Sequence, residues 1–115
     1  MPHELINLTL PVVVAQIENV LEDYPESPYQ VAFSLPELRH KLIAHVLSHI
    51  PNRYTVEGAK LPTKDFKMLY PSAMEERLRM EHLIRGGILH LLRENAQLVS
   101  RYIPQVEKSV YEPSY

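Results

Sequence analysis

Apolar residues recur at helical spacing in three parts of the chain, and this pattern predicts three main helices. The first begins near residue 10, with Pro11 in its first turn and Thr9 as the expected N-cap. Polar residues separate its apolar positions, as in a helix that packs through one face. The core-facing stripe consists of Val13, Ile17, Val20 and Tyr24, extended by Leu10, Val14 and Leu21.

The second helix is expected from residue 35 to residue 50. Ser34 and Glu37 have the spacing of a capping box, and Pro36 suits a first helical turn. Pro51 cannot continue a helix and restricts the residue before it, so the helix should end at Ile50. Basic residues and histidines fall largely on the face opposite the apolar stripe. That stripe consists of Leu35, Leu38, Leu42, Val46 and Ile50, widened by Ile43 and Leu47.

A second capping-box pair, Ser72 and Glu75, predicts a third helix that runs to residue 92 or on to about residue 102, before Pro104. Gly86 and Gly87 lie inside it, where each glycine costs about 1 kcal/mol relative to alanine. Such a pair either kinks a helix or lets another backbone approach, for which a helix of a second subunit is one candidate. The apolar positions are Met74, Leu78, Leu83 or Ile84, Ile88, Leu91 and Leu92.

The segments between these helices are less regular. Residues 24–35 contain two prolines and should form a linker whose Val31, Ala32 and Phe33 fill a hydrophobic gap. Within residues 51–70, Tyr54 to Val56 could form a short extended piece. We therefore expect an all-α fold, a small bundle of three main helices with short helical pieces. The expected organisation is an N-terminal extension (1–9), a helical domain (10–103) and a C-terminal tail (104–115).

The composition narrows the class of protein. The 115 residues suffice for one domain, and 45% hydrophobic and 23% charged residues are ordinary globular values. The chain contains no cysteine, which excludes a disulfide framework and a thiolate metal site. No apolar run reaches the roughly 20 residues that a membrane helix needs, and the first residues lack the features of a signal peptide. We expect a soluble, cytoplasmic protein.

Charge is distributed unevenly along the chain. Residues 1–34 contain five acidic residues and no Lys or Arg, whereas residues 35–101 contain eleven basic and seven acidic residues. An anionic ligand, if there is one, should therefore bind the middle of the chain. The competing interpretation is that the acidic and basic segments pair with each other in the folded protein.

Few residues suggest catalysis or metal binding. The chain has no cysteine nucleophile, no GxSxG elbow and no P-loop, so we expect no enzymatic activity. His45 and His49 are spaced to chelate a metal from one helix face, but no third ligand is evident. We interpret the histidines as surface residues and expect no metal.

A cluster of basic and aromatic residues after Pro51 favours an anion or nucleotide ligand. Arg53 offers a guanidinium group for phosphate or a guanine edge, and Tyr54 offers a ring on which a base can stack. Each residue alone could be an ordinary surface residue, so the hypothesis depends on their clustering. The candidate ligand-binding residues are Asn52, Arg53, Tyr54, Thr55, Lys60, Lys64, Lys67, Arg77 and Arg79.

The string from Ala44 to Tyr54, which ends in Ile-Pro-Asn-Arg-Tyr, resembles the late-competence-development ComFB family, whose helix ends in a Leu-Pro-Pro-Arg-Tyr-like string. The resemblance covers about residues 10–103. It implies a homodimeric, all-helical receptor for cyclic di-GMP, or cyclic di-AMP, that contacts a transcription regulator or another protein. Some members bind zinc through cysteines, which this chain lacks, so zinc is not expected.

One alternative is a dimeric interaction module without a small ligand, structural or regulatory in role. In that case Arg53 and Tyr54 would hold the end of the second helix in place. Direct binding to DNA is not favoured, because the basic excess is small and no recognition helix is evident.

Overall fold

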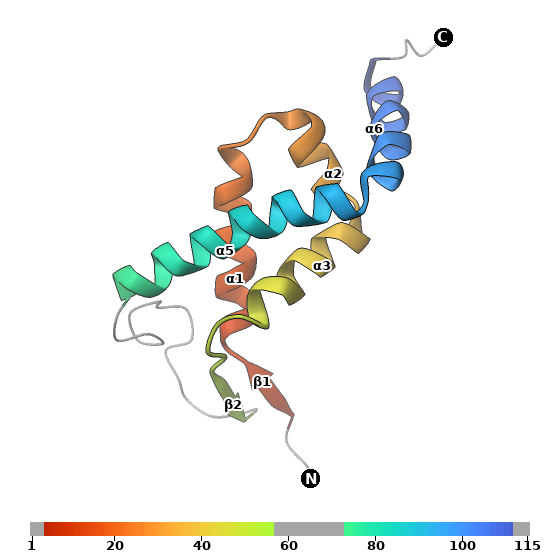
Figure 1. Ribbon diagram of the computed structural model, residues 1–115. Helices are drawn as coiled ribbons and strands as arrows, with labels where there is room; N and C mark the ends of the chain where they lie inside the picture. Colours follow the sequence, from red (N-terminus) through yellow and green to blue (C-terminus); the bar gives the residue numbers. More distant parts are fainter. Residues whose placement is uncertain (1–3, 57–72, 112–115) are drawn as a thin grey trace.

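The computed structural model describes residues 4–56 and 73–111. This part of the chain is mostly helical and includes one small antiparallel sheet, which confirms the predicted all-α class (Figure 1). None of the described helices is long and apolar enough to cross a membrane. The elements are β1 (Leu5–Asn7), α1 (Thr9–Glu22), the short helical segment η1 (Glu26–Gln30), α2 (Val31–Phe33), α3 (Pro36–Leu47), β2 (Tyr54–Val56), α5 (Ala73–Glu94) and α6 (Ala96–Tyr111).

Helices α1, α3 and α5 pack against one another and enclose the core, and Figure 1 shows α5 crossing α1. Helix α6 leaves the end of α5 in a new direction and packs on α2 and η1. The three large helices each contribute fully buried side chains. These are Val13 and Ile17 from α1, Leu38, Leu42 and Val46 from α3, and Met80, Ile84 and Ile88 from α5.

The predicted stripes agree with burial in α3 and only partly in α1 and α5. In α1, Leu10 and Val14 remain 40% and 37% exposed, so the predicted extension of the stripe through them is wrong. In α5, Met74 and Leu78 are exposed and Met80 is buried in their place. Leu10 and Val14 line an open groove between α1 and α3, together with Ile43 and Leu47, so they are only partly covered.

Two of the predicted N-caps are wrong. Ser34 does not cap α3, since its hydroxyl donates to the carbonyl oxygen of Val31 at 2.6 Å. Thr9 lies inside α1, and Asn7 takes the capping role: its Oδ1 accepts the backbone N–H groups of Thr9 at 2.8 Å and Leu10 at 3.1 Å. The third predicted cap, Ser72, lies outside the described residues.

The helix ends also differ from the prediction. Helix α3 ends at Leu47, before Ile50, because the N–H of His49 bonds the carbonyl oxygen of Val46 at 3.0 Å and tightens the chain into a turn. Helix α5 ends at Glu94, and a new helix, α6, runs to Tyr111 with Pro104 inside it. A proline within a helix removes one backbone hydrogen bond and need not end the helix.

The segment between α1 and α3 is more ordered than the predicted linker. It forms η1 and α2, whose Ala32 and Phe33 are buried and fill the gap as expected. The side-chain amide of Gln30 donates to the carbonyl oxygens of Leu21 at 3.1 Å and Tyr24 at 2.9 Å. These bonds satisfy acceptors at the end of α1 that a helix leaves unpaired.

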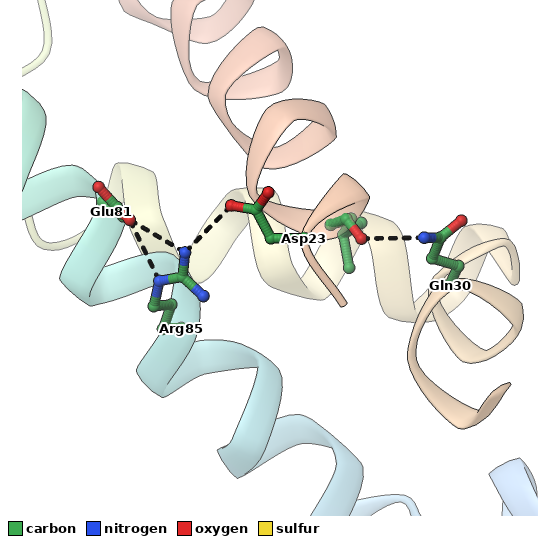
Figure 2. Close-up of polar contacts among 5 residues, drawn as sticks. Asp23, Gln30, Glu81 and Arg85 are labelled. Atoms are coloured by element: carbon green, nitrogen blue, oxygen red, sulfur yellow. Dashed lines mark hydrogen bonds and ion pairs between the residues drawn. The ribbon is translucent and has the colours of Figure 1, made fainter. Parts of the chain in front are cut away.

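Ion pairs connect acidic α1 and its C-terminal end to α3 and α5. Glu18 pairs with Arg39 of α3, and Asp23 Oδ2 lies 3.4 Å from Arg85 Nη2 of α5. Figure 2 shows Arg85 between Asp23 and Glu81, whose Oε1 lies 3.0 Å from Arg85 Nη2; the hydrogen bond to Glu81 raises the pKa of Arg85. The charge asymmetry of the sequence is thus partly neutralised within the fold.

The two adjacent glycines of α5 have different surroundings. A Cβ atom on Gly87 would lie 2.8 Å from Leu42 Cδ1 and 2.8 Å from His45 Cδ2, whereas nothing lies within 4 Å of one on Gly86. At Gly87 the close approach is made by side chains of α3 in the same chain, and not by another backbone as expected. Helix α5 continues through both glycines.

We expect Gly87→Ala to be less stable than Gly86→Ala by about 1–3 kcal/mol in free energy of unfolding, because only the new methyl group at residue 87 displaces packed side chains. Both variants gain helix propensity, about 1 kcal/mol each, so their difference isolates the contact with α3. Urea unfolding, followed by circular dichroism, measures the difference in free energy of unfolding between the two variants. Equal stabilisation of the two variants would contradict the close approach of α3 and α5.

Candidate functional site

The end of α3 is closed by the side chain of Asn52. Its Nδ2 donates to the carbonyl oxygens of Leu47 at 2.7 Å and Ile50 at 2.9 Å. Its Oδ1 accepts a hydrogen bond from Asn7 Nδ2 at 3.0 Å. Asn52 therefore satisfies acceptors at the end of one helix and connects them to Asn7, the residue that caps α1.

The backbone of Arg53 is fixed against the start of α1. Its N–H donates to Thr9 Oγ1 at 2.8 Å, and its carbonyl oxygen accepts the N–H of Leu8 at 2.7 Å. Thr9 is fully buried and Leu8 nearly so, which shields both bonds from water. The side chain of Arg53 is exposed, so a rigid backbone holds a cation at the surface.

Tyr54 follows directly and begins strand β2. Its Cα pairs with that of Asn7, and Thr55 pairs with Ile6, in the antiparallel β1–β2 ribbon. The side chain of Tyr54 is 53% exposed and that of Thr55 is half-buried. The predicted extended piece at Tyr54–Val56 is confirmed, and an aromatic ring stands at the surface next to Arg53.

The other candidate residues divide into two groups. Lys60, Lys64 and Lys67 lie outside the described residues. Arg77 and Arg79 are exposed in the first half of α5. Figure 1 shows the start of α5 at the left of the molecule and β2 below α3.

Residues 52–54, which follow the end of α3, are called the exit below. Sequence reasoning missed Asn7, Leu8 and Thr9 as supports of this exit. Residues 1–9 have no periodic pattern, and the bonds join them to residues more than forty positions later. One local signal was present, since asparagine is among the preferred residues for capping a helix start. No local pattern indicates that the next helix would end against this cap.

The histidines lie closer together than their spacing in the sequence suggests. The ring centroid of His45 is 4.7 Å from that of His49 and 6.3 Å from that of His90 in α5. Burial lowers the pKa of His45, and the nearby imidazoles of His49 and His90 lower it further. In the described ranges, no group of three or more His, Asp or Glu side chains is arranged to hold a metal ion.

No protein-family model matches the chain, and neither a curated protein nor a solved structure matches it significantly. Any function must therefore be argued from the residues themselves.

We expect Asn52→Ala to lower the free energy of unfolding by about 1–3 kcal/mol, because it leaves partly buried acceptors at the end of α3 without a donor. Asn19→Ala is the matched control, since Asn19 is exposed within α1 and alanine slightly favours the helix. Urea unfolding of the two variants measures the difference. An Asn52→Ala variant as stable as the control would contradict the role of Asn52 at the exit.

Proposed function

We propose that the chain is a non-enzymatic receptor for a cyclic dinucleotide, cyclic di-GMP or cyclic di-AMP, and that it acts as a homodimer. The observation that carries this proposal is the exposed pair Arg53–Tyr54 on a backbone fixed by the bonds to Leu8 and Thr9. The ComFB resemblance rests on the same residues, Ile50 to Tyr54.

The chemistry of the pair suits this ligand. A cyclic dinucleotide presents two phosphates and two purine bases. The guanidinium of Arg53 can bond a phosphate or the O6/N7 edge of guanine in a bidentate manner, and the ring of Tyr54 can stack on a purine. Because the backbone that carries both groups is already fixed, little backbone conformational entropy is lost on binding.

The remaining candidates would complete the ligand environment. Asn52 and Thr55 flank the pair in the sequence, and five further cations would add positive charge toward the phosphates. Homodimerisation fits a ligand that is itself two-fold symmetric, because two copies of the site can then contact equivalent halves. The five cations are Lys60, Lys64, Lys67, Arg77 and Arg79.

Signalling would follow from a ligand-biased shift in the position of the β1–β2 ribbon, which begins where the fixed backbone of Arg53 ends. The β1–β2 ribbon continues from Arg53, so a ligand held by Arg53 and Tyr54 acts directly on the ribbon. A changed ribbon position alters the surface offered to a protein partner, which the ComFB resemblance suggests is a transcription regulator.

We expect Arg53→Ala to weaken binding of cyclic di-GMP by about 10- to 100-fold, because a hydrogen bond to a charged group contributes about 1.5–3 kcal/mol. Arg101→Ala, which removes an exposed arginine from α6, should leave the affinity unchanged. Isothermal titration calorimetry measures both variants. Absence of heat and of a thermal shift with the wild-type chain at millimolar cyclic di-GMP and cyclic di-AMP would refute the receptor proposal.

One observation favours a second candidate, an interaction module without a small ligand. The bonds at Asn52 and Arg53 hold the fold together whether or not a ligand binds. In that case Arg53→Ala would change the melting temperature or partner binding and no nucleotide would bind. The same calorimetry therefore separates the two candidates.

A further inference from the structure

Three imidazoles meet where the last turn of α3 packs on α5. We refer to His45, His49 and His90 as the histidine cluster. His45 and His49 are one turn apart at the end of α3, and the ring of His90 lies nearly parallel to that of His45, with an interplanar angle of 29°. The cluster thus spans the interface between two core helices.

Close packing leaves the ring of His45 little room. A Cβ on Gly87 would lie 2.8 Å from His45 Cδ2, so the ring rests directly over the glycine of α5. Leu42, which is fully buried one turn earlier in α3, approaches the same glycine, with its Cδ1 2.8 Å from that Cβ position. His45 is half-buried, so a charge on its ring is partly removed from solvent.

The cluster and the exit share hydrogen-bond acceptors on the last turn of α3. The carbonyl oxygen of His45 accepts a bond from Ser48 Oγ at 2.9 Å and lies 2.7 Å from His49 Nδ1. Two residues after His45, the carbonyl oxygen of Leu47 accepts the side-chain amide of Asn52. A displacement of this last turn therefore displaces the acceptors that hold the exit.

Few groups are placed to compensate a charge on His45. From α3 it faces His49 and, one turn earlier, Lys41, whose Nζ lies 3.5 Å from Glu37 Oε1. From α5 it faces His90, whose Nε2 lies 3.3 Å from Glu94 Oε1. Within the described residues, no carboxylate forms an ion pair with His45 itself.

We propose that the histidine cluster is a proton-sensitive contact between α3 and α5. Protonation at mildly acidic pH places like charges side by side and shifts the last turn of α3, together with the exit at Asn52 and Arg53. The proposal concerns regulation by protons and does not depend on a nucleotide ligand.

The direction of the pH effect follows from the titration of His45. In the unfolded chain an imidazole titrates near pH 6.5, whereas burial and the two neighbouring imidazoles lower the pKa of His45 in the folded protein. As the pH falls below about 6.5, the unfolded chain binds this proton first. The contribution of His45 to stability is therefore constant above about pH 6.5 and becomes unfavourable below it.

The direct test is an NMR titration of the histidine ring protons in the whole chain between about pH 5 and pH 8, a range chosen around the imidazole pKa. Removing a neighbouring imidazole with His49→Gln or His90→Gln should raise the titration midpoint of His45. His82→Gln is the control, because His82 is exposed on the same helix as His90 and should leave that midpoint unchanged. A His45 midpoint that neither neighbour affects would overturn the proposal.

Coupling to the exit is tested in the same spectra. The backbone amides of Ile50, Asn52 and Arg53 should shift with the midpoint of His45 in the wild-type chain and lose that titration in His45→Gln. If His45→Gln does not fold, the midpoint of these amides in His90→Gln should move upward together with that of His45. The proposal is wrong if these amides do not respond to pH, or if they keep their midpoint when that of His45 moves. Either result would show that protonation of the cluster does not shift the exit.

Discussion

The close approach of α3 and α5 at Gly87 is the contact on which the rest of the structure depends. Without a side chain at this position, Leu42 and His45 can rest on the backbone of α5, and the buried faces of the two helices interlock. Helix α1 then packs on both and completes the core with Val13 and Ile17. The helix-propensity cost of a glycine is offset by the packing that its small size permits.

Helix α3 ends at Leu47, two residues after His45. Its last turn lies on α5 through the histidine cluster, and the chain then turns sharply to meet the start of α1. Asn52 closes the turn, while Leu8 and Thr9 hold the backbone of Arg53. Stability and the proposed ligand-binding function thus depend on the same short segment, so Asn52 and Arg53 need different experiments to separate the two roles.

Charged residues have a smaller part in the fold. The pairs Glu18–Arg39 and Asp23–Arg85 connect α1 and its C-terminal end to the two helices that pack on it, but each pair is partly exposed to solvent. Exposed ion pairs contribute little to stability because solvent screens them. They show instead that part of the basic excess is used within the fold.

Local patterns in the sequence determined the helical class and the core of α3. Leu38, Leu42 and Val46 are buried as their spacing predicts, because helical periodicity depends only on residues within a few turns. Tertiary structure decided what depends on distant residues. Ser34 bonds Val31 and Tyr102 instead of capping α3, and Leu10 stays partly exposed because it lines an open groove between α1 and α3. The ring of His90 lies next to that of His45, and Thr9 Oγ1 accepts the N–H of Arg53. The residues of each pair are more than forty positions apart in the sequence. The sequence contains these residues, but only the packing of α1, α3 and α5 brings them together.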